Sequence, residues 1–337
     1  MSEFVIVGAG AIGAIVGVAL IEAGHDVRFI DSNRDHVEAV RAHGLRLSGH
    51  RQARVAAPIG TPEQVDWPLR QVLLAVKSRH TVEALRPLAN RLARDGFVVS
   101  LQNGLEEYRI ADLIGASRTV GAFLTFGGHY KAPGEIVFGG PGTFRVGEMD
   151  GATTPRIVAL QQAFSALQPV EVTDNIFGFL WSKIVLSAIY FATATTDSDV
   201  TDLYAVARHR DLFGRLAGEV VAVAEAKGVR LEAFDGFDAT AFRPGATPDQ
   251  AAIAAAWEGQ NRYWMSHESK RTGIWRDLAI HKRKTEADRL IAPVIEIARE
   301  AGIATPRIAR LVAVVNEIEN GQRPLAVENL SVLKSGG

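Results

Sequence analysis

The first half of the chain alternates short, continuous apolar runs with longer stretches of helical periodicity. Each run is rich in β-branched residues, as expected of a strand buried on both faces of a parallel sheet. The helical stretches cover residues 14–23 and 80–93, and Gly24 is placed to end the first of them. This alternation predicts a doubly wound α/β sheet of the Rossmann type. The predicted strands are residues 4–7, 27–30, 71–78 and 97–104.

Strand signals stop near residue 172, and helical patterns alone follow. The glycine-rich segment 122–148 predicts an antiparallel extension of the sheet or a cover on it. We predict a dinucleotide-binding domain at residues 1–174 and an all-helical domain at residues 175–337, with the substrate cleft between them. The predicted helices run from about 175 into the 190s and over 210–228, 247–267, 284–302 and 305–321.

Helix-start and helix-break residues refine this second half. Thr247 and Pro248 have the order typical of a helix start, and so do Thr305 and Pro306. Pro293 lies inside the predicted helix 284–302 and is expected to kink it.

Composition narrows the class of protein. The 337 residues carry a formal net charge of −1 and no basic block, so we expect neither a nucleic-acid nor a membrane partner. Cysteine is absent, which excludes disulfides and fits the reducing cytoplasm. No apolar run reaches the roughly 18 residues of a membrane span. The nine histidines form no metal-binding pair, so we expect no metal.

A glycine fingerprint directly follows the first predicted strand. Gly8, Gly10 and Gly13 have G-x-G-x-x-G spacing. The first glycine permits a tight turn, the second lets a pyrophosphate approach the backbone, and the third lets helix and strand pack closely. With Ala11 and Ile12, free N–H groups at the helix start face the anion. The spacing predicts a dinucleotide site, and a glycine-rich turn without a ligand is the alternative.

Asp31 ends the second predicted strand, eighteen residues after Gly13. An acidic residue at this place hydrogen-bonds the ribose hydroxyls of the cofactor and repels a 2′-phosphate, so NAD is favoured. Arg34 is close in the sequence and is able to pair with a phosphate, which leaves NADP possible. A turn or helix-cap role for Asp31 is the alternative.

Polar residues also follow the next two predicted strands. Lys77 lies at the end of the strand 71–78, and Asn103 lies in the Gln-Asn-Gly end of the strand 97–104. Ligands bind at the carboxyl ends of the strands in an open α/β sheet, so both residues are candidates to contact cofactor or substrate. A solvated lysine and an ordinary Asn-Gly turn are the alternatives.

One lysine interrupts the most apolar stretch of the second half. Residues 179–196 read FLWSKIVLSAIYFATATT, in which Lys183 is the single charged residue. Burial lowers the pKa of a lysine and so favours proton donation near neutral pH. A lysine with a buried stem and a solvated ammonium group is the alternative.

The chain resembles the ketopantoate reductase (2-dehydropantoate 2-reductase) family nearly end to end. Many families share the glycine fingerprint, whereas the QNG segment, the lysine in its helix and the RKTE block are more specific. The matching segments are GAGAIG at the start, VKS at 76–78, QNG at 102–104, LWSK at 180–183, TGIWRD at 272–277, RKTEAD at 283–288 and AGIATPRIARL at 301–311.

The resemblance implies roles for four positions. In that family the lysine at the position of Lys183 is the general acid, and the glutamate at the position of Glu286 binds the hydroxyl or carbonyl side of the substrate. Residues at the positions of Lys77 and Asn103 help to hold the nicotinamide ribose and the substrate. The implied reaction reduces a 2-oxo acid to a 2-hydroxy acid with NADH or NADPH.

Substrate-binding positions depart from the family pattern. Asparagines that family members carry one and two turns after the lysine are Ser187 and Phe191 here, and a family serine aligns with Gly273. Loss of amide contacts changes which substrate is accepted, so we expect a more apolar or differently shaped 2-oxo acid or ketone. The candidates for its contacts are Tyr190, Phe191, Trp275 and Arg276, of which Arg276 would anchor the carboxylate.

The sequence therefore predicts a cytoplasmic NAD(P)H-dependent reductase of a small-molecule 2-oxo acid, with a homodimer possible. Two alternatives stay open. One is a catalytically weak NAD(P)-binding regulatory protein, because the polar substrate contacts are reduced. The other is an opine-type, amine-forming dehydrogenase on the same two-domain plan.

Overall fold

The computed structural model describes residues 2–245, 249–266 and 269–334. The chain divides into two compact units, Met1–Ile176 and Phe177–Gly337. The predicted helix start at Thr247 and Pro248 lies outside the described residues.

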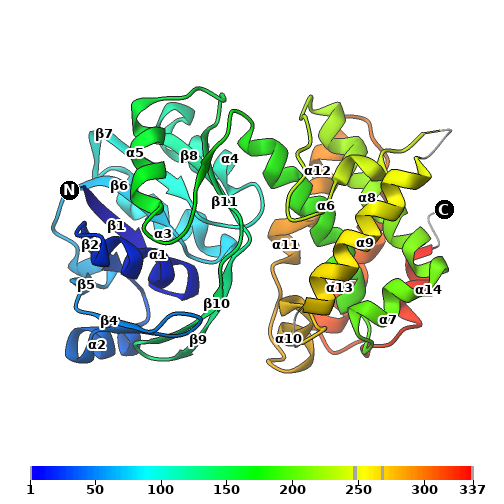
Figure 1. The fold of residues 1–337 in the computed structure, drawn as a ribbon, viewed down its shortest axis with the longest axis horizontal. Coiled ribbons are helices and arrows are strands. Elements are labelled where there is room, and N and C mark those ends of the chain that lie inside the picture. Colours follow the sequence, from blue (N-terminus) through cyan, green and yellow to red (C-terminus); the bar gives the residue numbers. More distant parts are fainter. Residues whose placement is uncertain (1, 246–248, 267–268, 335–337) are drawn as a thin grey trace. The chain divides into compact units, whose positions relative to one another are not determined.

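The first unit contains an eight-stranded sheet in which six strands run parallel (Figure 1). Their order β5-β2-β1-β6-β7-β8 is the doubly wound order, so the predicted Rossmann-type fold is confirmed. Next to β8, β11 runs antiparallel and β12 forms the edge. The strands are β1 (Glu3–Val7), β2 (Asp26–Ile30), β5 (Ile59–Gly60), β6 (Leu69–Leu74), β7 (Leu92–Ser100), β8 (Thr119–Leu124), β11 (Phe144–Glu148) and β12 (Glu171–Val172).

Helices cover both faces of this sheet, which is why its central strands are apolar on both sides. Phe4 and Ile6 of β1 join the core formed with α1 and α5, while Val5 and Val7 join the core formed with α3 and α4. The helix α2 contacts the short strand β5. The helices are α1 (Ala11–Glu22), α2 (Arg34–His43), α3 (Thr81–Ala89), α4 (Glu106–Ile114) and α5 (Pro155–Phe164).

A second, four-stranded sheet covers α1 on its outer side. A Cβ at Gly128 in this sheet would lie 2.8 Å from the Ile15 side chain of α1. The segment 122–148 therefore does two things: β11 extends the main sheet, and the hairpin β9–β10 helps to build the cover. The strands of the second sheet are β3 (Leu45–Gly49), β4 (Ala53–Val55), β9 (Gly127–Ala132) and β10 (Glu135–Gly140).

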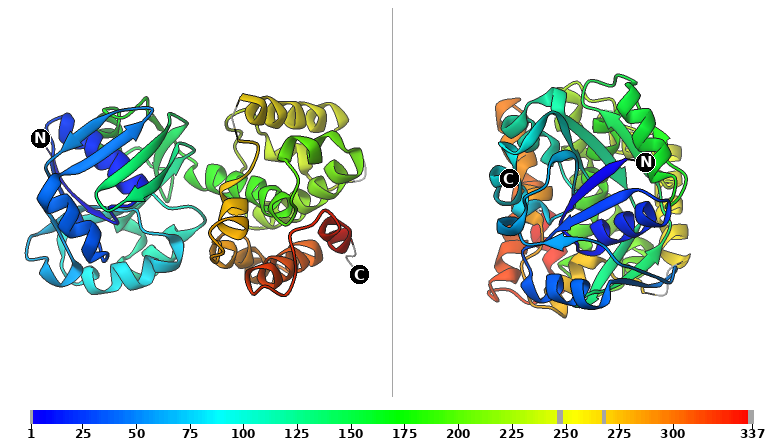
Figure 2. Two further views of the ribbon diagram at one scale, coloured as in Figure 1. Left: turned by 90° about the horizontal axis from the view of Figure 1, so that it is seen from below. Right: turned by 90° about the vertical axis from the view of Figure 1, so that its left-hand side faces the viewer.

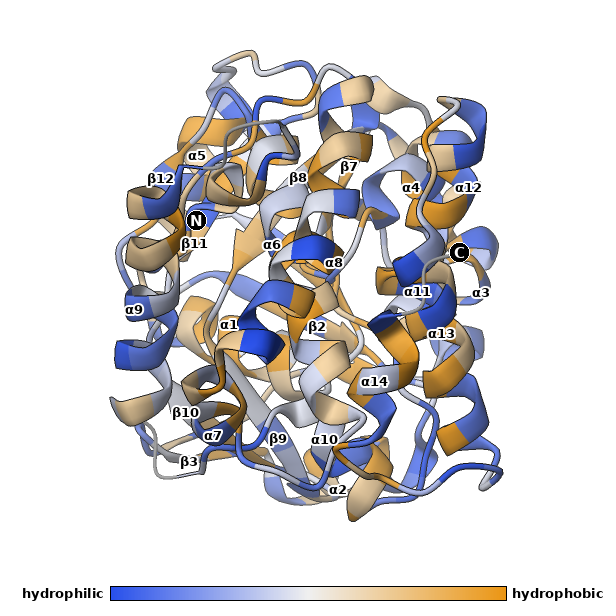
Figure 3. Ribbon diagram, turned by 90° about the vertical axis from the view of Figure 1, so that its right-hand side faces the viewer, coloured by the Kyte–Doolittle hydropathy of each residue, from blue (hydrophilic) through white to orange (hydrophobic). Residues whose placement is uncertain are grey.

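The described part of the second unit contains helices and no strand, so the predicted helical character is confirmed (Figure 2). Its outer helices carry hydrophilic and hydrophobic stretches side by side (Figure 3). The helices are α6 (Ile176–Ala194), α7 (Val200–Ala205), α8 (Ala207–Ala226), α9 (Gln250–Ser266), α10 (Gly273–Ala279), α11 (Ala287–Leu290), α12 (Ala292–Glu300), α13 (Pro306–Glu319) and α14 (Asn329–Lys334).

Two expectations for this unit need correction. The predicted kinked helix 284–302 is two helices, because Pro293 lacks an N–H and starts α12 instead of bending one helix. The expectation that no segment is long enough to span a membrane is also wrong, since Lys183 does not interrupt α6. That helix has 19 residues and a mean hydropathy of 1.6, but 78% of it is buried, as in a core helix.

Candidate active site

The glycine fingerprint lies between β1 and α1, where the strand order of the sheet reverses. Gly8 has a φ of +99°, and a Cβ there would lie 2.8 Å from the Val76 nitrogen. A Cβ at Gly13 would lie 2.0 Å from the Gly8 oxygen. A Cβ at Gly10 meets no described atom within 4 Å. Packing therefore requires the first and third glycines, whereas the second borders open space.

That open space lies in front of the first turn of α1. From Phe4 to Leu20 only Gly10, Ala11 and Ile12 are partly exposed. The N–H groups of a first helical turn have no partner within the helix, and they carry the positive end of its dipole. An open backbone cradle at such a turn fits the pyrophosphate of a dinucleotide cofactor.

Hydrogen bonds hold both the backbone N–H and the backbone oxygen of Ala9. Asp31 Oδ2 accepts the Ala9 N–H at 2.8 Å, and Asp31 Oδ1 accepts the Asn33 N–H at 2.8 Å. The Ala9 oxygen lies 3.0 Å from Nε2 of His36, which is 1% exposed. His36 Nδ1 accepts the Gly134 N–H at 3.0 Å, so its proton is on Nε2, which donates to Ala9. Asp31 thus supports the glycine loop through both carboxylate oxygens, and its expected contact with the cofactor ribose stays a prediction.

Sequence reasoning missed His36. His36 lies in the first turn of α2 beside the buried Val37, and nothing in the local sequence pattern indicates that its own side chain is buried. Its partner Gly134 is 98 residues away, so the contact depends on the second sheet.

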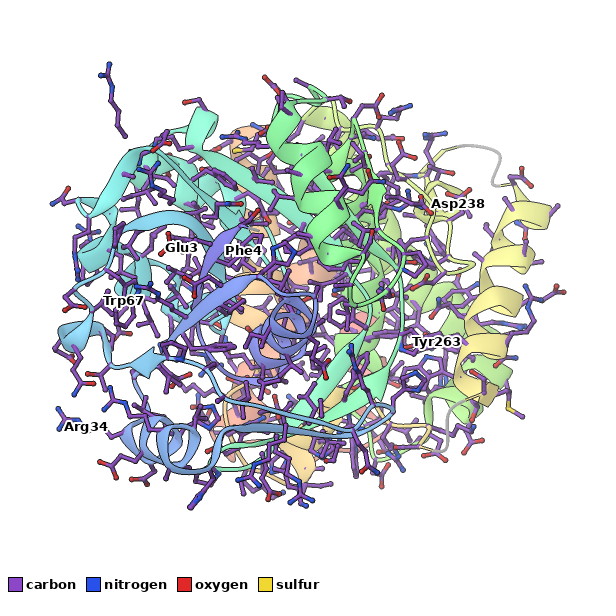
Figure 4. All side chains as sticks on the ribbon, turned by 60° about the vertical axis from the view of Figure 1, so that its left-hand side comes forward. Glu3, Phe4, Arg34, Trp67, Asp238 and Tyr263 are labelled. Atoms are coloured by element: carbon purple, nitrogen blue, oxygen red, sulfur yellow. The ribbon has the colours of Figure 1, made fainter. Side chains whose placement is uncertain are left out.

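We predict that Asp31→Ala raises the ratio of NADPH to NADH affinity about tenfold, which is about 1.4 kcal/mol. The reason is that the carboxylate repels a 2′-phosphate, while Arg34 stands exposed at the start of α2 (Figure 4). Calorimetric titration with both cofactors measures the ratio. His36→Ala is the control, because it loosens Ala9 without changing the charge, so both affinities should fall together. An unchanged ratio in Asp31→Ala would contradict the prediction.

Gln102 joins the loops that follow β6 and β7. Its Nε2 donates to the Val76 oxygen at 2.9 Å and to the Thr81 hydroxyl at 2.8 Å. The two strands are parallel neighbours, so Lys77 and Asn103 stand on adjoining loops at the same edge of the sheet. Both side chains are exposed. Their expected contact with cofactor or substrate stays a prediction.

Glu107 of α4 is an acid in the core of the first unit, with 0% exposure. Burial raises its pKa to about 8, so the folded protein holds it protonated at neutral pH. The unfolded chain binds fewer protons there above about pH 4.5, and stability therefore falls as pH rises toward 8.

We predict that Glu107→Gln stabilises the protein at pH 7 by on the order of 3 kcal/mol, because the amide needs no protonation. Urea unfolding at several pH values measures the effect. The gain should disappear below about pH 4.5, where the acid is neutral in both states. A gain that is independent of pH would show that burial of the acid is not its cause.

In the second unit, α6 presents one open stripe. From Gly178 to Ala194 only Lys183, Ser187 and Tyr190 are partly exposed, and all other residues are buried. The spacing i, i+4, i+7 places the three side chains on one face of the helix. The structure therefore places the single charge of α6 on the face that is partly exposed.

Two carboxylates act on Lys183. Burial in apolar surroundings lowers its pKa, Asp235 and then Glu286 partly offset this, and the pKa is about 8 as a result. Glu286 directly precedes α11. The adjacent Thr285 is fixed by Glu319 of α13, whose carboxylate accepts the Thr285 N–H at 2.7 Å and its hydroxyl at 2.6 Å. Glu286 and Asp235 thus lie within electrostatic range of Lys183, and the sequence did not indicate Asp235. The catalytic roles of Lys183 and Glu286 stay predictions.

Tyr190 is an uncharged aromatic residue on the same partly exposed face of α6 as Lys183. Its hydroxyl donates to Gln260 Oε1 of α9 at 2.7 Å, and its ring lies edge-on to Trp264 with centroids 5.4 Å apart. Burial raises the Tyr190 pKa well above its ordinary value, so the hydroxyl stays protonated. Tyr190 is thus the aromatic side chain on the stripe.

The other residues predicted to contact the substrate differ in their exposure and their hydrogen bonds. The Ser187 hydroxyl donates to the Lys183 oxygen at 2.7 Å, within the helix. Phe191 has 0% exposure, so the expectation that it contacts substrate is wrong and it belongs to the core. Gly273 and Arg276 are exposed in α10, and no hydrogen bond or ion pair found in the described residues joins them to Lys183. Their role stays a prediction.

Comparison with known proteins covers both units. The family model described as Ketopantoate reductase PanE/ApbA matches residues 4–151, and the model Ketopantoate reductase PanE/ApbA C terminal matches residues 175–319. A 2-dehydropantoate 2-reductase of Pyrococcus abyssi is 28% identical over 304 residues, covering 89% of this chain and 92% of that protein. One of Pyrococcus horikoshii is 33% identical over 191 residues, covering 54% and 60%.

Solved structures resemble the whole chain. A PanE/ApbA family ketopantoate reductase from Ralstonia eutropha is 28% identical, with a TM-score of 0.78 over 96% of this chain and 99% of that one. A D-mandelate dehydrogenase solved with NADH and anilino(oxo)acetate has a TM-score of 0.79 with the same coverage. At 20% identity, this second likeness concerns the fold.

Proposed function

Because the chain belongs to the ketopantoate reductase family of NAD(P)-dependent oxidoreductases that act on a keto group, we propose that it reduces a 2-oxo acid to a 2-hydroxy acid with Lys183 as proton donor. The observation that carries the proposal is the open stripe of α6, where Lys183 stands between apolar surroundings and two carboxylates. Such a lysine is charged at pH 7 and yet gives up its proton more readily than an ordinary one.

The chain's own groups account for the proton side of the reaction. When bound, the reduced nicotinamide supplies the hydride for the ketone carbon. The Lys183 ammonium group donates a hydrogen bond to the carbonyl oxygen, stabilises the charge that develops there and delivers the proton to it. Glu286 keeps Lys183 charged and accepts a hydrogen bond from the hydroxyl group that forms on the reduced carbon. The first unit holds the cofactor through the glycine loop, with Asp31 at the ribose.

The substrate we propose is less polar than 2-dehydropantoate. Ser187 is small and bonded within its own helix, and Tyr190 offers a ring whose hydroxyl is already engaged by Gln260. Neither replaces the amide contacts of the family pattern. A 2-oxo acid with an apolar or aromatic side chain fits the surface that Ser187 and Tyr190 form. Arg276 is our candidate to bind the carboxylate of that substrate.

Oxidation of NADH and NADPH with a panel of 2-oxo acids tests the function. The panel holds 2-dehydropantoate, branched aliphatic 2-oxo acids and phenyl-substituted ones, each with and without ammonia. We expect turnover that falls as pH rises through about 8, where Lys183 loses its proton. Cofactor binding without turnover would favour the regulatory alternative, and oxidation that requires ammonia would favour the amine-forming one.

Location and assembly remain proposals as well. We infer a cytoplasmic enzyme from the composition. A homodimer is also proposed; a ketopantoate reductase from Staphylococcus aureus, similar in fold at 15% identity and a TM-score of 0.70, is described as dimeric. Sedimentation of the purified chain tests this part.

A further inference from the structure

Asp235 lies at the tip of a tight turn between α8 and α9. The Phe234 N–H donates to the Phe237 oxygen at 3.0 Å, and the Phe237 N–H donates to the Phe234 oxygen at 2.7 Å. Asp235 and Gly236 have φ values of 46° and 74°. Two positive φ angles define a type I′ turn, for which Asp-Gly is a preferred pair. The backbone conformation thus fixes where the Asp235 side chain begins.

The turn is attached to the helices that carry the candidate site. A Cβ at Gly259 of α9 would lie 2.1 Å from the Gly236 oxygen, so the turn rests directly on α9. Gln260, the partner of Tyr190, is the next residue. On the other side, the Glu232 N–H donates to the Ser182 hydroxyl of α6 at 3.1 Å. The turn is therefore held on one side by Gly259, the residue before Gln260, and on the other by Ser182, the residue before Lys183.

Chain length places Asp235 close to Lys183. Asp235 is three positions after Glu232, which corresponds to about 10 Å of extended chain at most. Glu232 is bonded to Ser182, the residue before Lys183. The side chain of Asp235 is exposed and is not packed into the core.

Three titratable groups respond to the Asp235 carboxylate. It raises the pKa of Lys183 more than Glu286 does, after the larger lowering by burial. It also adds to the raised pKa of Tyr190 and of Tyr263, in each case after burial as the main cause. Two carboxylates therefore act on Lys183, one from the turn and one from the start of α11, and the Asp235 carboxylate also acts on one tyrosine of α6 and one of α9.

We propose that Asp235 is a positioning residue of the reaction site, which holds the ammonium group of Lys183 from the tip of this fixed turn. The inference rests on the proposed function in that Lys183 is taken as the proton donor. Two carboxylates beside one ammonium group leave the site with one negative charge in excess. After Lys183 has given its proton to the substrate oxygen, both carboxylates favour its return to the charged form, with the proton taken from solvent.

The variant Asp235→Asn tests the proposal in the full-length protein. Asparagine keeps the shape and tolerates a positive φ, so the turn is retained. Competitive acetylation of lysines with acetic anhydride at a series of pH values, read by mass spectrometry, gives the apparent pKa of Lys183 without any turnover. We expect this pKa to fall by about one unit in the variant.

Asp238→Asn is the matched control. Asp238 lies in the same loop, accepts the Thr240 N–H at 2.9 Å and caps a short 3-10 helix (Figure 4). It should leave the Lys183 pKa unchanged. A Lys183 pKa in Asp235→Asn within about 0.3 units of the parent, or an equal shift in the control, would overturn the proposal.

The pH profile of kcat separates the two levels of inference. If Lys183 is the acid, the alkaline fall in kcat moves to lower pH in Asp235→Asn by the shift seen in labelling. A labelling shift without a kinetic shift would support the contact with Asp235 and overturn Lys183 as proton donor. No labelling shift would overturn the role of Asp235, whatever the enzyme reduces.

Discussion

Replacing Lys183 by alanine is expected to lower kcat by about 10²- to 10⁴-fold, with NAD(P)H affinity nearly unchanged. The loss follows because no other cation among the residues described acts on this part of α6, and the carbonyl oxygen then has no proton donor. The glycine loop proposed to hold the cofactor belongs to the other unit, so the affinity for NAD(P)H should not fall with kcat. Steady-state rates at saturating 2-oxo acid and fluorescence titration of the cofactor measure the two effects.

Two further variants sharpen this test. Lys183→Arg keeps the positive charge but holds its proton near neutral pH, so kcat should stay low. Lys227→Ala removes an exposed lysine at the end of α8 and should leave kcat unaltered. If Lys183→Ala lost less than about tenfold in kcat, general acid catalysis by this lysine would be ruled out.

Gly10→Ala is expected to weaken NAD(P)H binding at least about tenfold, or about 1.4 kcal/mol, without lowering the melting temperature. The added Cβ meets no described protein atom within 4 Å, so the fold accommodates it. It would occupy the space through which the pyrophosphate approaches the first turn of α1. Calorimetric titration measures affinity and thermal unfolding measures stability.

Gly13→Ala provides the contrast. Its Cβ would lie 2.0 Å from the Gly8 oxygen, so the backbone must shift. We expect a loss of about 1–3 kcal/mol in stability, typical of overpacking. Normal cofactor affinity in Gly10→Ala would show that the open space in front of α1 is not where the pyrophosphate binds.

The strands that the sequence predicted well are β1 and β2, in which most residues are buried. β1 and β2 lie within one residue of the predicted runs, since their apolar residues face covered sides of the sheet. β6 and β7 end earlier than expected, because the segments that follow turn toward the Gln102 hydrogen bonds. β3 and β4 escaped prediction: their polar residues form strands only by pairing with each other and, for β3, with the distant β10.

The candidate site was likewise predictable only in part. Lys183 and Glu286 were predicted as a pair from the resemblance to a family. The local sequence pattern alone was equally consistent with a Lys183 whose ammonium group is solvated. Phe191 was misplaced because position i+8 is about 80° from Lys183 around a helix, while Tyr190 at i+7 is within about 20°. The Asp-Gly turn at Asp235 was readable as a turn. Its approach to Lys183 depends on how α9 packs, which one sequence does not reveal.

The open stripe of α6 has a consequence for how substrate preference changes. Of its three side chains, the proposed chemistry requires Lys183 alone. Ser187 is partly exposed and its hydroxyl bonds within the helix, whereas Tyr190 packs its ring against Trp264 and bonds to Gln260. Under the proposed function, we expect substitutions at Ser187 to alter selectivity at small cost in folding, and those at Tyr190 to alter it while also losing the contacts with Gln260 and Trp264. A directed-evolution library confined to these two positions is a compact route to reductases for new 2-oxo acids.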